Sequence, residues 1–228
     1  MALIGPAAML LWFDIDPEHV AEHDEWHTRE HFPERVGIPG FLRAQRWISA
    51  ASSPRYHILY EVADVGVLSS APYLKRLNNP TPWTSRMMMH YRGMVRGYCR
   101  LESGTGTVLG TTGVSVRFSA ARDMELPLQA WLDRELIPRL AARRGFASAF
   151  LFRSGGAPEM TVEQKIRGRD AGAEWVLLAT GYSADLMNEL AATDLAAGAF
   201  EAHGASSGTI SVAYQLACLS DQAASRPG

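Results

Sequence analysis

One stretch of this sequence occurs twice, and that repeat constrains the fold more than any other feature. Residues 25–47 and 130–152 align without a gap at an offset of 105 residues. The identical pairs include Trp26/Trp131, Arg29/Arg134, Glu30/Glu135, Pro33/Pro138, Gly40/Gly145 and Phe41/Phe146. The period exceeds the roughly 20–50 residues of solenoid repeats, which indicates a tandem duplication of a whole small domain. Function is then expected where the two copies differ.

The length and charge of the chain limit its class. With 228 residues it is long enough for two half-size units. Lys and Arg number 22 against 24 Asp and Glu, so the net charge favours neither nucleic acid nor a membrane as partner. The apolar start ends at Asp14, too early to span a bilayer, and we expect a first strand and a cytoplasmic protein. Cys99 and Cys218 show no CxxC spacing and are expected to be small buried residues.

Each half has the same predicted order of elements, strand-helix-strand-strand-helix-strand. Apolar runs, alternation and Pro/Gly punctuation give this order. The first half is expected to have strand 9–15, helix 17–36, strands 41–49 and 56–62, helical pieces 71–78 and 81–91, and strand 94–102. The second half is expected to have strand 113–119, helix 125–143, strands 146–153 and 174–182, helix 184–202 and strand 209–218. The prediction is an α+β fold, with two tandem ferredoxin-like βαββαβ units forming an intramolecular α+β barrel.

The predicted domain boundaries follow from this order. The first unit spans residues 1–103 and the second spans 107–220, with a Gly/Thr-rich linker between them. An insertion at 155–172 changes the offset between the halves from 105 to 119. Its charges and glycines predict a mobile surface loop.

The first half also carries motifs that point to a known family. Its helix reads WxxxEHxPE over residues 26–34, Pro-Gly-Phe follows at 39–41, and LSSAPYLKRLNNPTPWTSRMMMHYRG spans 68–93. The helix motif resembles that of the dimeric α+β barrel superfamily, and within it the EthD-like proteins. The longer run resembles a signature of bacterial relatives of that group. The resemblance covers both halves for the fold and residues 26–96 for the signature, and it implies a ligand pocket between the helices and a concave sheet.

A stripe of histidines marks the main difference between the copies. The stripe lies at helical i, i+4 spacing, and each member has an apolar counterpart at the offset of 105: His19/Met124, His23/Leu128, His27/Leu132 and His31/Leu136. If the geometry is shared, the first half directs imidazoles where the second directs leucines. A water-containing pocket would remove the ~1–3 kcal/mol cost of burying each imidazole without a partner. Alternatively the helix is rotated, so that the stripe meets solvent while Val20, Trp26, Phe32 and Val36 are buried.

Further substitutions make the first half the candidate active-site half and the second half the scaffold. Polar or aromatic residues of the first half replace mainly apolar ones of the second, namely Gln45, Trp47, His57, Tyr60, Trp83, Arg86 and His90. Singly, each is expected more often in a structural than in a functional role. As a set they predict a substrate pocket lined by His23, Trp47, Tyr60, Trp83, Arg86 and His90.

Two features limit the reaction classes that the sequence supports: the motifs it lacks and the histidines it carries. No P-loop, GxGxxG, GxSxG or HExxH pattern occurs. An imidazole, with an ordinary pKa of ~6.5, can take a proton from an acidic carbon or phenol and return it. The first hypothesis is a cofactor-independent lyase or isomerase that dehydrates, cyclises or decarboxylates an aromatic, polyketide-like or lactone substrate. His31 would be the general base and His27 its partner acid or orienter. Glu30 would fix the tautomer of His27, or alternatively lie in solvent on the helix surface.

Two other hypotheses remain open. One is a barrel enzyme that holds haem or a divalent metal on the histidine stripe, with Glu30 or His90 as a further ligand; the resemblance includes haem proteins with tandem units. The other is a ligand-binding barrel without catalysis. A homodimer is possible in every case, because duplication removes the need to dimerise without forbidding it.

Overall fold

The computed structural model describes residues 2–155, 161–168 and 170–221, which form two compact units. The first-half unit consists of Ile4–Cys99, Gly155–Gly172 and the residues from Ala217 onward; the second-half unit consists of Met1–Leu3, Arg100–Ser154 and Ala173–Leu216. Among the described residues, no helix is both long and apolar enough to cross a membrane.

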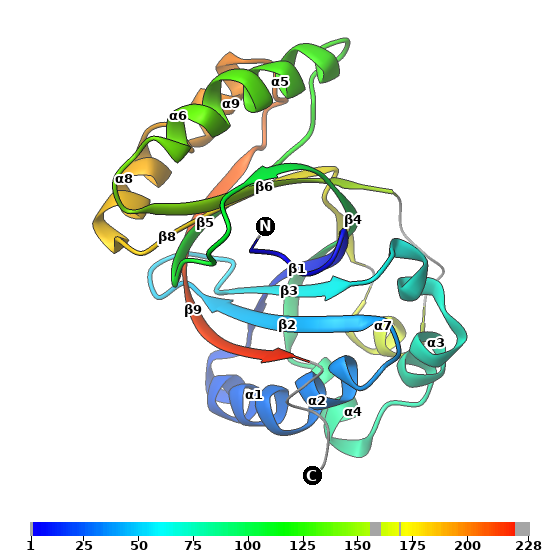
Figure 1. Cartoon of the computed structure of the whole chain (residues 1–228). Coiled ribbons are helices and arrows are strands. Elements are labelled where there is room, and N and C mark those ends of the chain that lie inside the picture. Colours follow the sequence, from blue (N-terminus) through cyan, green and yellow to red (C-terminus); the bar gives the residue numbers. More distant parts are fainter. Residues whose placement is uncertain (1, 156–160, 169, 222–228) are drawn as a thin grey trace. The chain divides into compact units, whose positions relative to one another are not determined.

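The first-half unit contains the expected elements, with its long helix divided by a π-helical turn. The elements are β1 (Ala7–Ile15), η1 (Pro17–His19), α1 (Val20–Trp26), the π turn η2 (His27–His31), α2 (Phe32–Val36), β2 (Phe41–Ile48), β3 (Tyr56–Val62), η3 (Val65–Ser69), α3 (Ala71–Asn78), α4 (Pro82–Met88), the first part of β4 (Tyr91–Thr105), α7 (Val162–Arg167) and β7 (Ala171–Gly172). The side chains of Ser70 and Thr81 cap α3 and α4 and accept backbone N–H groups that have no helical partner. Figure 1 shows α1 and α2 running alongside β2.

The second-half unit repeats this order. Its elements are β5 (Thr112–Phe118), α5 (Glu125–Trp131), the π turn η4 (Leu132–Leu136), α6 (Ile137–Ala141), β6 (Phe146–Ser154), β8 (Trp175–Gly181), α8 (Ala184–Ala192), α9 (Ala197–Ala202) and most of β9 (Ile210–Asp221). The single helix expected over 184–202 is two helices, because Thr193 leaves the helical region at φ −127 and ψ −98. Figure 1 shows α5 and α6 in line, beside α8 and α9.

The elements of the two halves coincide at the offsets of the sequence repeat. The bounds of α1 and α5, η2 and η4, and α2 and α6 each differ by 105 residues, and those of β3 and β8 differ by 119. Each π turn is followed by a short α-helix whose second residue is a shared proline, Pro33 or Pro138. A proline inside an α-helix has no N–H and its ring clashes with the carbonyl four residues earlier. In the π turn the Phe32 N–H instead bonds to the His27 carbonyl, five residues back, and this extra residue accommodates the ring.

The strand pairings confirm the predicted fold class. β1 and β2 both pair antiparallel with β3, so the expected hairpin of strands 41–49 and 56–62 is confirmed. β5 pairs antiparallel with β8 and β9, and β6 with β8. The hydrogen-bonded order is β1-β3-β2-β9-β5-β8-β6-β4-β7, and a further β1–β4 pairing closes it. This is an α+β fold with two ferredoxin-like sets of elements and a closed, barrel-type strand order.

Strand alternation gives the sheet of the first-half unit two faces. Met9, Leu11 and Phe13 of β1 and Tyr60 of β3 point to the helices and join one buried cluster with Trp26. The residues between them point to the opposite face. In the second-half unit the corresponding cluster includes Leu128, Leu132 and Leu136, so its helix face packs apolar side chains. Cys99 is buried and Cys218 is partly buried.

The insertion is not the surface loop that the sequence predicts. Residues 156–160 and 169 of the expected loop lie outside the described residues, but the rest forms α7 and β7. Thr161 and Gln164 form a capping box at the start of α7, and β7 pairs in parallel with β4. Glu163 is 2% exposed. The insertion interrupts the second half of the sequence, yet its described part packs into the first-half unit.

Candidate active site

A small cavity lies between the helices and the sheet of the first-half unit. Its volume is about 30 Å³, enough for one or two water molecules. Polar groups reach the cavity from six elements: η2, α2, β3, α3, β4 and α7. The lining residues are Met9, Leu11, Phe13, His27, His31, Arg35, Ile58, Tyr60, Tyr73, Leu77, Met88, Tyr91, Met94, Arg96, Glu163 and Arg167.

The histidine stripe faces the protein interior. His23, His27 and His31 are 0, 2 and 7% exposed, so the alternative in which a rotated helix places the stripe in solvent is wrong. Burial holds the pKa of His27 and of His31 well below the ordinary value, and neighbouring cationic groups lower both further. Both imidazoles are therefore neutral at pH 7 and can accept a proton.

Four polar atoms at this cavity are buried and have no hydrogen-bond partner among the described residues. They are His27 Nδ1, His31 Nδ1, Arg35 Nη1 and Tyr60 Oη. Buried polar groups in native proteins are nearly always satisfied, and a group left unpaired costs about 1–3 kcal/mol. Four such atoms around one cavity are the expected arrangement for a site whose hydrogen bonds are completed by water or a ligand.

Arg35 extends the histidine stripe by one further turn. It is 2% exposed, and its Nη2 donates to both carboxylate oxygens of Glu163 at 2.8 and 2.9 Å. Burial opposes its charge, but the Glu163 carboxylate raises the pKa of Arg35 above the ordinary value. Because Nη2 makes both bonds, Nη1 stays available to the cavity.

A second ion-pair group lies beside Arg35 and Glu163 and joins the insertion to Arg96 of β4. We call these five residues, Arg35, Arg96, Glu163, Arg167 and Asp170, the charged wall of the cavity. Asp170 accepts from Arg167 Nη2 at 2.9 Å and from Arg96 Nη2 at 2.8 Å, and all three side chains are 5% exposed. The wall therefore carries three guanidinium groups against two carboxylates. The one uncompensated positive charge favours an anionic ligand or a developing negative charge in the cavity.

Glu30 is placed away from the cavity. Its Oε1 accepts from Trp26 Nε1 at 3.1 Å, Thr81 Oγ1 at 2.5 Å and Thr84 Oγ1 at 3.1 Å. These bonds tie the first helix to the start of α4. The expected contact in which Glu30 fixes the tautomer of His27 is not formed.

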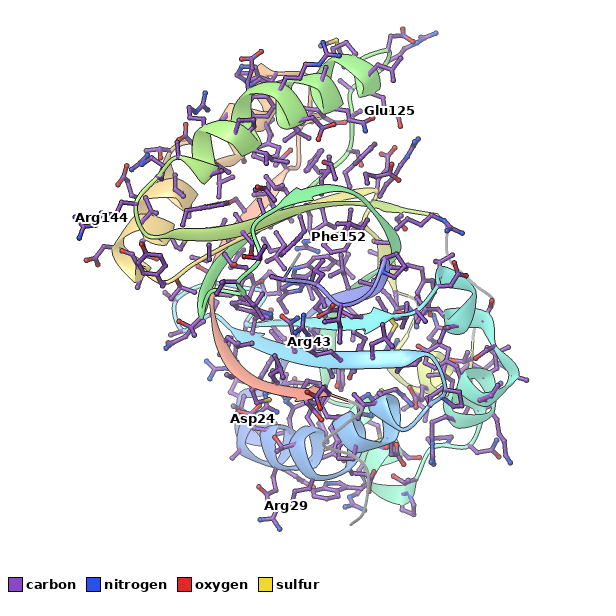
Figure 2. All side chains as sticks on the ribbon, in the orientation of Figure 1. Asp24, Arg29, Arg43, Glu125, Arg144 and Phe152 are labelled. Carbon is purple, nitrogen blue, oxygen red and sulfur yellow. The ribbon has the colours of Figure 1, made fainter. Side chains whose placement is uncertain are left out.

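Trp47 points to the other face of the sheet. Its Nε1 donates to Gln45 Oε1 at 3.1 Å, and Gln45 Nε2 donates to Glu61 Oε1 at 2.8 Å. Arg43, labelled on β2 in Figure 2, also binds Glu61, with Nε 2.6 Å from Oε1. Trp47 and Tyr60 differ in face because their positions on β2 and β3 differ in the strand alternation.

The remaining predicted pocket residues lie outside the cavity lining. Trp83 Nε1 donates to Glu22 Oε1 at 3.0 Å, and Arg86 is more than half exposed. The His90 ring stacks on His19 with centroids 3.5 Å apart. Of the nine residues predicted for the site, the structure brings His27, His31 and Tyr60 together at the cavity, with His23 behind them.

Sequence reasoning missed the charged wall. Arg35 follows His31 at the same i+4 spacing as the stripe itself, and this continuation was a usable signal. Glu163 and Arg167 lie 128 or more residues along the chain from Arg35, in a segment that resembles a loop. The insertion was marked as unusual by its charges, its glycines and the change of offset, but none of these indicated a contact with Arg35.

The metal and haem hypotheses require ligand side chains at the cavity. In the described part of the chain, no three His, Cys, Asp or Glu side chains are grouped as metal ligands. At about 30 Å³ the cavity would have to widen for a porphyrin, as for any ring-sized ligand, and the carboxylates beside it are bound to guanidinium groups. These carboxylates therefore do not fit the role of ligands to a divalent metal.

The fold and the cavity define a ferredoxin-like α+β protein with a buried polar pocket, and solved structures of that fold are similar to it. One is an anthrone oxidase-like protein, with TM-score 0.67 and 11% identity, covering 97% of this chain and 96% of that one. Another, titled "Putative monooxygenase", is from Fusobacterium nucleatum, with TM-score 0.57, 8% identity and 96% of each chain covered. A mutant chlorite dismutase from Candidatus Nitrospira defluvii has TM-score 0.52 and 8% identity, with 93 and 90% covered.

Identity this low shows a shared fold and nothing finer. No family model and no curated protein matches the sequence.

Proposed function

We propose that this protein is a small-molecule enzyme that removes a proton from an enolisable aromatic, polyketide-like or lactone ring by histidine acid-base chemistry. The observation that carries the proposal is the set of four unpartnered polar atoms, on His27, His31, Arg35 and Tyr60, around one cavity. The similar fold of an anthrone oxidase-like protein supports the choice of ring class.

The geometry supports distinct roles for these groups. His31, neutral at pH 7, takes the proton from carbon or phenol, with His27 as its partner acid. The enolate or phenolate oxygen that forms accepts hydrogen bonds from Arg35 Nη1 and Tyr60 Oη. Donors held in a dry site before the reaction stabilise such an oxyanion more strongly than water does. A lyase or isomerase step, namely dehydration, cyclisation or decarboxylation, follows from the same enolate.

A second function starts from the same enolate. The fold similarity to an anthrone oxidase-like protein supports oxidation by dioxygen, in which a ring CH₂ becomes C=O and the second oxygen atom leaves as water. Both functions require proton abstraction, and they differ in oxygen consumption. A ring-sized substrate also requires the cavity to widen from about 30 Å³.

Hydrogen exchange of anthrone in D₂O tests the shared step. Proton NMR should show the methylene signal disappear with wild-type protein, and His31→Ala should slow this exchange at least about 100-fold. His203→Ala, an exposed histidine of the second-half unit, is the matched control and should exchange as wild type. An oxygen electrode separates oxidation from lyase or isomerase chemistry. Binding without exchange for anthrone and for related ketones, phenols and lactones would instead support the non-catalytic barrel.

The finer family assignment is part of the same proposal. Coincident element bounds at offsets of 105 and 119, including both π turns, support origin by tandem duplication. The WxxxEHxPE motif supports an EthD-like ancestor for both copies. A cytoplasmic location and a homodimer remain predictions, and light scattering on purified protein tests the second.

A further inference from the structure

Three polar side chains form a continuous chain from solvent to the cavity. The Asp24 carboxylate is 31% exposed, and its Oδ1 lies 3.3 Å from His23 Nδ1. His23 is fully buried, and its Nε2 lies 3.3 Å from Tyr91 Oη. Tyr91 is 5% exposed and lines the cavity. Figure 2 shows Asp24 on the side of α1 toward β2, whereas Arg29 points away.

The contacts give this chain a direction. A carboxylate only accepts, so His23 Nδ1 carries the proton and donates it to Asp24. His23 Nε2 is then an acceptor, and the Tyr91 hydroxyl donates to it. Burial raises the pKa of Tyr91 and lowers that of His23, so both are neutral at pH 7. A lone pair of Tyr91 Oη remains for the cavity.

The imidazoles of the cavity have no comparable partner. A proton on His31 is opposed by Arg35 and Arg167, and one on His27 by Arg46 and Arg35. His23, by contrast, touches a carboxylate whose pKa is lowered, despite burial, by the hydrogen bond from His23 and by the Arg46 guanidinium. The ionised Asp24 carboxylate therefore favours a proton on His23, although burial still keeps the pKa of that ring below its ordinary value.

We propose that Tyr91, His23 and Asp24 form a proton relay between the cavity and solvent. This rests on the proposed function, because it moves the proton that the enzyme abstracts. A proton from the cavity binds Tyr91 Oη as the tyrosine proton passes to His23 Nε2. The Nδ1 proton passes to the Asp24 carboxylate and then to water. Only O–H and N–H bonds change, and inward transfer of a solvent proton restores the first tautomer.

The same contacts also anchor the helix to the sheet, so the test needs a control for that role. Asp24 Oδ1 accepts from Tyr56 Oη at 3.0 Å, and Asp24 O accepts from Arg46 Nη1 at 3.1 Å. Tyr56 is absent from the cavity lining. Tyr56→Phe therefore removes an anchor of Asp24 and leaves the path to the cavity intact.

Hydrogen exchange of anthrone in D₂O distinguishes a relay from an anchor. Asp24→Asn and Tyr91→Phe should slow the appearance of solvent deuterium in anthrone at least about tenfold, because an abstracted proton that cannot leave returns to the carbon. Tyr56→Phe should stay within about twofold of wild type. Wild-type exchange rates in Asp24→Asn and Tyr91→Phe, with exchange lost in His31→Ala, would reject the relay and leave the proposed function standing.

A second measurement needs no substrate. Nitrogen-15 NMR of the histidine rings should show His23 as the Nδ1–H tautomer, with its N–H exchanging rapidly with water although it is buried. Asp24→Asn should slow that exchange at least about tenfold. An Nε2–H tautomer, or a ring proton equally slow in both proteins, would overturn the relay even if anthrone proves not to be a substrate.

Discussion

The ion pair between Arg35 and Glu163 gives the sharpest test of how the insertion is held. Both side chains are almost fully buried, at 2 and 3% exposure, with one guanidinium nitrogen bonded to both carboxylate oxygens. Glu163→Gln keeps the shape and one acceptor but removes the charge. Breaking a buried pair from one side costs about 3–5 kcal/mol, because the other charge stays buried without compensation. One hydrogen bond survives, so we expect about 3 kcal/mol.

Urea unfolding followed by tryptophan fluorescence measures this cost. With a slope of about 2 kcal/mol per molar urea, the midpoint of the first-half unit should fall by about 1.5 M. Glu34→Gln is the matched control, since its carboxylate lies 3.1 Å from Arg76, which is 42% exposed. Glu34 itself is 15% exposed, and breaking such a partly exposed pair should cost about 1 kcal/mol. The double variant Arg35→Met with Glu163→Met should unfold closer to wild type than Glu163→Gln does.

Equal midpoints for Glu163→Gln and Glu34→Gln would refute this reasoning, and so would a double variant that unfolds at lower urea than Glu163→Gln. Either result would mean that the carboxylate of Glu163 is not the main compensation for the charge on Arg35.

Three further outcomes follow from the site. Burial lowers the pKa of His23, His27 and His31 in the folded protein, so the unfolded chain binds more protons than the folded one below pH ~6.5. The free energy of unfolding should therefore fall below that pH by up to about 1.4 kcal/mol per pH unit for each histidine. Urea midpoints measured at pH 7.5 and 5.5 check this. Tyr60→Phe should leave stability within about 1 kcal/mol but weaken binding of a phenolate ligand about tenfold by calorimetry, since its hydroxyl has no partner inside the described protein. Glu30→Ala should cost about 3 kcal/mol in thermal unfolding, because it removes three hydrogen bonds.

Most of the fold could be predicted from local sequence patterns. Prolines and glycines end the elements, and the alternation of apolar residues fixes β3 at residues 56–62, as predicted. The repeat then fixes the second half. The π turn was not predictable from periodicity, because the i, i+4 spacing of His27 and His31 reads equally as α-helix. The break at Thr193 was hidden by the run of alanines around it.

The site was predictable only as far as one helix determines it. The inward orientation of His27 and His31 was predicted from their counterparts in the second half, Leu132 and Leu136, which are fully buried. Trp47 and Trp83 failed to join them because an aromatic side chain on a strand or surface helix gives no signal of which cavity it enters. Glu163 joined them through a tertiary contact across 128 residues of sequence, and no local rule predicts such a contact.

Burying His27 and His31 without hydrogen-bond partners should lower the stability of the first-half unit. The second-half unit has leucines at these positions and avoids this cost. Replacing His27 and His31 by leucine, their counterpart residue, removes two buried atoms that lack partners. If each unpaired atom costs about 1–3 kcal/mol, partly offset by water, the double variant should be more stable than wild type by about 1–2 kcal/mol. Thermal unfolding measures this gain, and the variant should also lose anthrone exchange.

Leu132→His with Leu136→His is the reciprocal variant. Both leucines are fully buried in an apolar cluster, so two imidazoles there should destabilise the second-half unit by several kcal/mol, on the order of 2 or more for each. Stability that falls when His27 and His31 become leucine would mean that these rings already have full partners. In that case the cavity would be a packing feature and not a site maintained for a ligand at the expense of stability.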